Sequence, residues 1–283
     1  MLELFNRTTL QCSKIITENY STSFTLGIRT LDRKFHLPIY AIYGFVRFAD
    51  EIVDTFHDFD KKDLLDRFRK EAFQAIEEKI SLNPVLHSFQ LVVNQYHIEH
   101  ELIEAFLNSM EMDLYEHTYT PDGYQQYVYG SAEVVGLMCL RVFCEGNEAQ
   151  YDHLREGARS LGAAFQKVNF LRDLKSDFQD RGRVYFPGVD FKAFDPNAKK
   201  CIEADIQADF DAAYKAILQL PKGARQGVYL AYVYYCTLFN KIKSLPAARV
   251  QEERIRVPDS RKLALLAQTY VKFRISALTA SLW

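Results

Sequence analysis

Acidic side chains at helical spacing occur in two separate segments of this chain. Asp50 and Asp54 are four residues apart in the first, and Asn169, Asp173 and Asp177 keep the same spacing in the second. Four residues are close to one helical turn, so each set is expected on one face of a helix. Such hard oxygen ligands suit Mg²⁺, which takes one or two carboxylates and completes its shell with water and phosphate oxygens. Two such faces, opposed across a helical cavity, would hold a diphosphate through bridging metals and promote its departure.

Both acidic segments follow apolar sequence, residues 40–46 before the first and residues 161–165 before the second. Carboxylates on apolar helices are costly unless they are paired or coordinated. Arg47 and Arg172 stand beside the acids, as a diphosphate site with metals would require. Two alternatives remain open on these residues alone, namely two buried Arg–Asp ion pairs or solvated acidic helix faces.

Small residues are concentrated between the two acidic segments, in the stretch 127–138. Gly130, Ser131, Ala132 and Gly136 leave one helix face without bulk. Such a face either lets two helices approach closely or leaves a tunnel for a long apolar ligand. The 21 Phe and 17 Tyr residues are mostly expected in the core, although rings at a site could also stabilise a carbocation.

Helical periodicity predominates along the whole chain, and no stretch alternates convincingly with period two. Asn83-Pro84 and Thr120-Pro121 each pair an N-cap residue with proline at the first helical position. The irregular stretches are 182–196 and 245–258. The pattern predicts one all-α domain over residues 1–283, with helices at 3–19, 22–31, 37–57, 60–79, 84–96, 99–118, 121–144, 148–156, 158–181, 198–219, 223–245 and 259–280.

The composition narrows the class of protein. The formal net charge of −2 argues against a nucleic-acid surface. The five cysteines form no CxxC pair and no zinc spacing, and no signal peptide is apparent, which indicates a reducing cytosol. We find no run of about 20 apolar residues of the kind that spans a membrane.

Several segments together resemble the squalene and phytoene synthases. The resemblance covers roughly residues 10 to 275. The segments that carry it are 20–24, Tyr43 and 47–54 for the first signature, 166–177 and 182–187 for the second, 129–138 for the central small-residue helix, and Tyr235 with 253–257 near the end. The resemblance implies an all-α isoprenoid-synthase bundle around a central cavity, and head-to-head condensation of two prenyl diphosphates.

The resemblance also implies a role for individual residues. The implied metal ligands for Mg²⁺, or for Mn²⁺ in its place, are Asp50, Asp54, Asn169, Asp173 and Asp177. The implied catalytic residues are Asp50, Asp54, Asp173, Asp177, Arg47 and Tyr43. Contacts to the diphosphate are expected from Ser21, Ser23, Arg47, Arg172, Arg183, Tyr185, Tyr235 and Arg254, and the cavity lining from Phe24, Tyr43, Val135, Gly136 and Gln166. This chain departs from the family pattern at Glu51, Glu133 and Ser176, whose roles the sequence leaves open.

The substrate is less narrowly defined. The chain looks most like bacterial phytoene synthases, which favours two C20 geranylgeranyl diphosphates as substrates and phytoene as the product. The runner-up is a C15 enzyme that makes squalene or dehydrosqualene, and NADPH is expected only for the squalene branch. A terpene cyclase, a chain-elongating prenyltransferase and a non-catalytic relative remain as readings from other classes. We expect a cytoplasmic protein. Since the product is apolar, we also expect peripheral contact at the inner membrane face. The residues do not define an oligomeric state.

Overall fold

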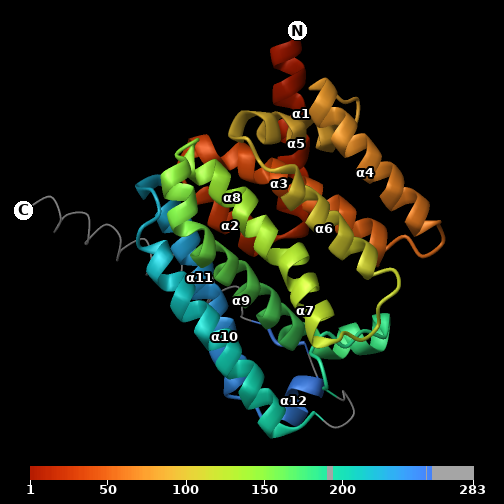
Figure 1. Cartoon of the computed structure of the whole chain (residues 1–283), viewed down its shortest axis with the longest axis vertical. Helices are drawn as coiled ribbons and strands as arrows, with labels where there is room; N and C mark the ends of the chain where they lie inside the picture. Colours follow the sequence, from red (N-terminus) through yellow and green to blue (C-terminus); the bar gives the residue numbers. More distant parts are fainter. Residues whose placement is uncertain (190–193, 253, 257–283) are drawn as a thin grey trace, which may run out of the picture.

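The computed structural model describes residues 1–189, 194–252 and 254–256, and these residues are mainly helical (Figure 1). Over these ranges no strand is formed, and one isolated bridge joins Thr118 to Val184. The helices are α1 Leu2–Tyr20, α2 Thr22–Arg29, α3 Arg33–Asp54, α4 Lys61–Glu78, α5 Pro84–Tyr96, α6 His100–Met112, α7 Pro121–Val128, the π-helical turn η1 Tyr129–Glu133, α8 Val134–Cys144, α9 Glu148–Arg181, α10 Pro196–Ile217, α11 Lys222–Lys243 and α12 Ala247–Glu252. The prediction of an all-α fold is therefore confirmed.

Two of the predicted helix starts are formed by the caps that the sequence indicated. The Asn83 side chain accepts hydrogen bonds from the backbone N–H groups of Val85 and Leu86, and Pro84 begins α5. The Thr120 side chain accepts one from Gly123 in the same way at the start of α7. Each cap satisfies donors that the first helical turn leaves free.

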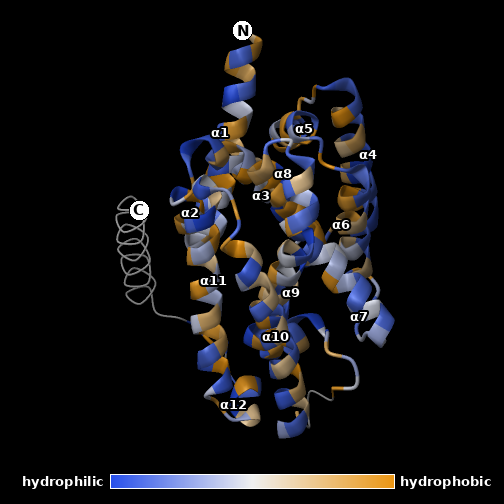
Figure 2. Cartoon of the chain, turned by 60° about the vertical axis from the view of Figure 1, so that its left-hand side comes forward, coloured by the Kyte–Doolittle hydropathy of each residue, from blue (hydrophilic) through white to orange (hydrophobic). Residues whose placement is uncertain are grey.

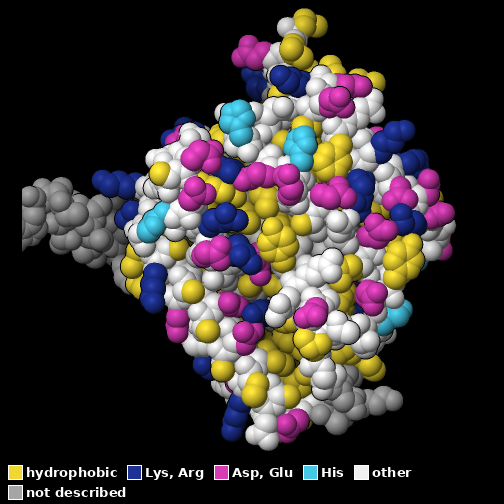
Figure 3. Space-filling view, viewed as in Figure 1, with side chains coloured by type: hydrophobic (Ala, Val, Ile, Leu, Met, Phe, Trp, Pro, Cys, Tyr) yellow, Lys and Arg dark blue, Asp and Glu magenta, His cyan; other side chains and the backbone are white. Residues whose placement is uncertain are grey.

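Helix α4, at the periphery of the bundle, is amphipathic. Helix α4 buries Leu65, Phe68 and Ile76 on one side, and Figure 2 shows polar residues along its opposite side. On the face seen in Figure 3, acidic and basic side chains are intermixed. This intermixing agrees with the small formal net charge of −2.

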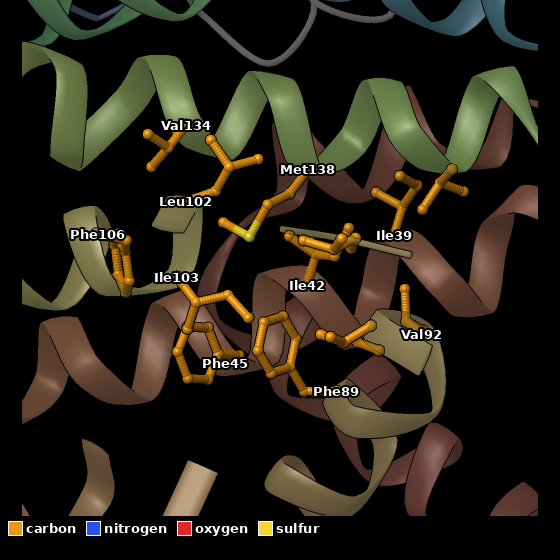
Figure 4. Packing of buried hydrophobic residues seen from close by; sticks show 14 of the residues in the cluster. Ile39, Ile42, Phe45, Phe89, Val92, Leu102, Ile103, Phe106, Val134 and Met138 are labelled. Atoms are coloured by element: carbon orange, nitrogen blue, oxygen red, sulfur yellow. The ribbon is translucent and has the colours of Figure 1, made fainter. Parts of the chain in front are cut away.

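The core consists of two clusters. The first surrounds α3, where Phe45 stacks on Phe89 with ring centroids 3.9 Å apart, and Ile42, Ile103 and Met138 pack around this pair (Figure 4). The second cluster lies between α9, α10 and α11 and includes the residues that follow α9. The acidic ends of α3 and α9 therefore each rest on an extensively packed apolar base.

Helix α9 is one continuous helix of 34 residues, where the sequence predicted two helices separated at residue 157. A Cβ atom added at Gly157 would lie 2.1 Å from the Cβ atom of Ala216 on α10. The glycine lets α10 pack directly on α9, and this tertiary contact offsets the low helix propensity of glycine.

Two other boundaries differ from the prediction by four residues or more. Helix α3 begins four residues earlier than expected and contains Pro38, because Phe35 is buried in the core and anchors the first turn. Helix α6 ends at Met112 rather than near residue 118. The reason is that the next residue, Asp113, is buried and turns its carboxylate into a polar cluster described below.

The small-residue stretch forms a helix with a π-helical turn at Tyr129–Glu133. Cβ atoms added at Gly130 and Gly136 would lie 2.5 Å and 2.8 Å from the backbone oxygens of Ala105 and Ala158. At these two positions the small residues therefore permit close helix packing, the first of the two alternatives that the sequence left open.

One run is long and apolar enough to cross a membrane by length and composition, among the residues that the structure describes. This run is Pro121–Cys144, and its apolar window is 56% buried inside the protein. This differs from the expectation that the chain contains no such run. Burial of this kind is typical of a core helix, so the run is weak evidence for a membrane span.

The predicted helix at 259–280 lies outside the described residues. The short helix α12 lies in a stretch that the sequence predicted to be irregular.

Candidate active site

The acids of the first signature lie on the last two turns of α3, and two of them, Asp50 and Glu51, share one arginine. Arg47 donates to Asp50 over 2.6 Å and also pairs with Glu51. Its guanidinium lies over the ring of Tyr20, 4.4 Å from the ring centroid. Glu51 is buried and serves as a partner of Arg47, which gives a structural role to a residue whose function the sequence left open.

The acids of the second signature lie on the C-terminal half of α9. Asp173 accepts hydrogen bonds from Arg172, with Nε to Oδ1 at 3.0 Å, and pairs with Arg254 at 2.7 Å. The Oδ1 atom of Asn169 accepts a hydrogen bond from the Tyr235 hydroxyl at 3.2 Å. Ser176 donates to the backbone carbonyl of Asp173, so its hydroxyl is engaged within its own helix.

Two arginines after the second signature connect it to the first. Arg181 pairs with Asp54 at 3.0 Å and with Asp177 at 2.8 Å. Arg183 pairs with the other oxygen of Asp54 at 3.0 Å and with Asp113 at 3.3 Å. Asp54 and Asp177, which are far apart in the sequence, therefore meet at one guanidinium group.

Sequence reasoning missed two members of this cluster. Arg181 had a local signal, since it follows Asp177 by four residues and so lies on the same helical face. Asp113 had no local signal in the sequence, because it is buried by contacts with residues that are distant in the chain. Tyr127 donates a hydrogen bond to its Oδ2 atom at 2.8 Å, and Arg183 donates to its backbone carbonyl at 2.7 Å.

The carboxylates remain crowded despite these arginines. Burial, and then repulsion from Asp54, raise the pKa of Asp50 to about 6. Burial, and then repulsion from Asp173, raise the pKa of Asp177 to about 6. Burial likewise raises the pKa of Asp113 to about 7. A site with these pKa values favours an additional positive charge.

The donor set fits a hard divalent cation in its chemistry, since it offers carboxylate oxygens from both helices and an amide oxygen from Asn169. Over the described part of the chain, no three His, Cys, Asp or Glu side chains are gathered closely enough to form a metal site by themselves. Mg²⁺ commonly binds through one or two carboxylates together with substrate phosphates, so this arrangement suits a metal that arrives with a diphosphate.

Aromatic rings border the acids. Phe24 stacks on Tyr43 at 4.9 Å between centroids, Phe165 on Tyr235 at 3.9 Å, and Phe170 on Tyr185 at 4.1 Å. Burial raises the pKa values of the Tyr43 and Tyr235 hydroxyls, which keeps them neutral. Neutral, electron-rich rings next to a leaving-group site can stabilise a cation.

The remaining predicted residues occupy several places around this cluster. Ser21 caps α2 by accepting a hydrogen bond from the Phe24 backbone N–H, and Ser23 lies half-buried on the same helix. Gln166 donates to the Ser131 hydroxyl at 3.2 Å. Val135 is half-buried against the first core cluster. Gly136 faces α9 at the close contact described above, and a lining role for it stays a prediction.

The fold and the site together define an all-helical protein with two opposed acidic motifs and a set of arginines around them. The family model for squalene/phytoene synthase matches residues 17–261. The chain belongs to the squalene/phytoene synthase family, whose members are prenyltransferase-type enzymes that condense prenyl diphosphates head to head.

Among relatives, 4,4'-diapophytoene synthase of Staphylococcus haemolyticus is 25% identical over 200 residues, which cover 69% of this chain and 67% of the relative. Phytoene synthase of Arthrospira platensis is also 25% identical, over 286 residues that cover 92% of each chain. The match covers only 65% of the chloroplastic phytoene synthase of Daucus carota and 44% of phytoene synthase 2 of Zea mays.

The solved structures agree on the fold. A dehydrosqualene synthase superposes with a TM-score of 0.80 at 20% identity, covering 95% of this chain and 98% of the other. The squalene synthase HpnC from Alicyclobacillus acidocaldarius superposes with a TM-score of 0.74 at 19% identity, covering 84% and 94%.

Proposed function

We propose that this protein condenses two molecules of geranylgeranyl diphosphate head to head to give phytoene and two diphosphates, in an Mg²⁺-dependent reaction. The observation that carries the proposal is the meeting of Asp54 and Asp177 at one guanidinium group, which brings the two signature helices to a common site. Asp50, Asp54, Asn169, Asp173 and Asp177 would hold the metal, which would neutralise the charge of the departing diphosphate.

Diphosphate leaves C1 of the first substrate molecule, and the double bond of the second attacks the resulting allylic cation. Loss of one proton closes a cyclopropyl diphosphate. Departure of the second diphosphate, ring rearrangement and loss of a second proton then give the polyene hydrocarbon.

The residues of the site suit each stage. Arg47, Arg172, Arg183 and Arg254 place guanidinium groups where a diphosphate would bind, and such groups pair well with phosphate oxygens. The stacked rings beside the acids would stabilise the cations through their negative faces. A water-poor site is required because water would trap a cation as an alcohol.

The proposal of a C20 substrate must be distinguished from the C15 alternative. The C15 alternative remains because the 4,4'-diapophytoene synthase and the Arthrospira platensis phytoene synthase are equally identical to this chain, at 25%. The two can be separated by giving the purified protein both C15 and C20 prenyl diphosphates in competition, with Mg²⁺ and without NADPH, and analysing the extract by mass. Predominant C40 hydrocarbon supports the C20 proposal. Predominant C30 hydrocarbon would assign the chain to the C15 branch, and a second reaction with NADPH would distinguish squalene from dehydrosqualene.

We also propose peripheral contact with a membrane through the loop that follows Asp54. Phe56 and Phe59 in this loop are 37% and 67% exposed, and their rings meet edge to face with centroids 6.2 Å apart. Exposed Phe side chains can insert at the boundary between the lipid headgroups and the acyl chains. The neighbouring Asp58 and Asp60 are balanced by Lys61 and Lys62, so the contact would be mainly apolar.

Co-sedimentation with phosphatidylcholine vesicles tests this contact. The double variant Phe56→Ser, Phe59→Ser should lose binding. Leu82→Ser, which replaces a residue that is 91% exposed at the opposite end of α4, should keep it. Wild-type protein that stays in the supernatant at low salt would contradict the proposal.

A further inference from the structure

Arg181 is the side chain that joins the two acidic motifs directly. It lies in the last turn of α9, where Nη1 is 2.8 Å from Asp177 Oδ1 and Nη2 is 3.0 Å from Asp54 Oδ2. The second oxygen of Asp54 is paired with Arg183 at 3.0 Å. Both oxygens of Asp54 are therefore engaged by guanidinium groups.

This arrangement sets up a competition for the same oxygen atoms. A divalent cation that binds Asp54 or Asp177 needs oxygens that Arg181 already contacts. The guanidinium would also repel a doubly charged ion at such short range, since charges separated by a few ångströms interact strongly even at a partly exposed site. Metal binding at these carboxylates therefore requires Arg181 to release at least one of them.

Of the two arginines at Asp54, Arg181 is the one with freedom to move. The Arg183 side chain is 7% exposed and is held by Asp113 through both its carboxylate and its backbone oxygen. The Arg181 side chain is 35% exposed. It is also the last helical residue, because Gly182 ends α9 with a φ of 67°. An exposed arginine at a helix end can change rotamer without disturbing the core.

We propose that Arg181 is an internal counter-cation, which holds the ends of α3 and α9 together and is displaced when a divalent cation binds with the substrate diphosphate. The inference rests on the proposed function, since it concerns the same metal-binding carboxylates. Displacement leaves the guanidinium beside the incoming diphosphate, whose negative charge compensates the lost ion pairs. Arg181 thereby disfavours binding of the metal alone and couples it to binding of the diphosphate.

The binding of Mn²⁺ alone, followed by calorimetry and by the loss of the free-ion paramagnetic signal, tests this proposal. Arg181→Met removes the charge and keeps a long side chain that is compatible with a helix. Arg67→Met is the matched control, because Arg67 forms an exposed pair with Asp63 at the same i, i+4 spacing and 2.9 Å. We expect about a tenfold tighter Mn²⁺ affinity in Arg181→Met and no change in Arg67→Met.

Thermal unfolding gives a second readout. In chelator the Arg181→Met protein should unfold at a lower temperature than wild type, because Asp54 and Asp177 lose a counter-charge. Added Mg²⁺ should raise its midpoint by more than it raises that of wild type. A merely structural role for Arg181 would lower the midpoint without tightening the binding of Mn²⁺.

Equal or weaker Mn²⁺ affinity in Arg181→Met than in wild type would overturn the proposal. If this occurs while the wild type still forms a head-to-head product, the inference about Arg181 fails and the proposed function stands. If neither protein binds Mn²⁺ and the wild type forms no product, both fail.

Discussion

At the scale of the residue, acids and arginines alternate through the site, so that each signature acid lies next to a guanidinium group. Arg47 forms an ion pair with Asp50, and Arg172 forms one with Asp173. Arg181 pairs with both Asp54 and Asp177. The sequence indicated the first two pairs, because each arginine stands beside its acid. It could not indicate the connection between Asp54 and Asp177, which depends on how α3 and α9 meet.

Carboxyl groups with raised pKa values lower the free energy of unfolding when they are ionised. Asp50 has a folded pKa of about 6, above its ordinary value, so its contribution to stability is complete at low pH and is lost as the pH rises through 6. Asp50→Asn should therefore raise the unfolding midpoint at pH 7.5 in chelator and flatten its fall between pH 4 and pH 7. The same variant should lose at least about a hundredfold in product formation. A lower midpoint than wild type at pH 7.5 would contradict this prediction.

Asp113 is predicted to position Arg183. Replacing it by alanine leaves a buried guanidinium without one of its charged partners, which costs about 3 kcal/mol. We expect Asp113→Ala to lower the free energy of unfolding in urea by that amount, whereas Asp63→Ala at an exposed ion pair should change it by less than about 1 kcal/mol. Equal effects in the two variants would show that Asp113 does not hold Arg183.

At the scale of the element, most helices were predictable because their periodicity and caps are local. Helix α5 is an example, since Asn83 and Pro84 determine its start and the structure has it as expected. The exceptions depend on contacts between elements. The continuity of α9 through Gly157 depends on α10, and the early end of α6 depends on the burial of Asp113.

The packing at Gly157 gives a prediction for α9. An added methyl group would meet Ala216 at 2.1 Å, so Gly157→Ala should lower the free energy of unfolding by about 1–3 kcal/mol despite its better helix propensity. Gly27→Ala is the control, since a Cβ atom at Gly27 in α2 meets nothing within 4 Å. This control should stabilise the protein by up to about 1 kcal/mol. Stabilisation of both variants would show that α10 does not pack on α9 at this point.

At the scale of the whole molecule, the sequence was sufficient for the fold class and the family, because two long acidic signatures in the right order are specific. The family match over residues 17–261 and the shared fold confirm both. The metal ligands remain predictions. The length of the substrate was not predictable, since we expect it to depend on how several helices pack around an apolar cavity. The register of the small-residue helix illustrates this, because the π-helical turn at Tyr129–Glu133 has no clear sequence signal.

If the acids of α3 and α9 act together on a prenyl diphosphate, the loss of either set should abolish the reaction. Purified wild type, Asp54→Asn and Asp177→Asn are incubated with geranylgeranyl diphosphate and Mg²⁺, and both hydrocarbon and released diphosphate are quantified. We predict a C40 hydrocarbon with two diphosphates released per molecule in wild type, dependent on Mg²⁺ and independent of NADPH, and almost none in either variant. Cyclised or C5-extended products from wild type would rule out head-to-head condensation, and full activity in either variant would rule out a joint role for the two acidic motifs.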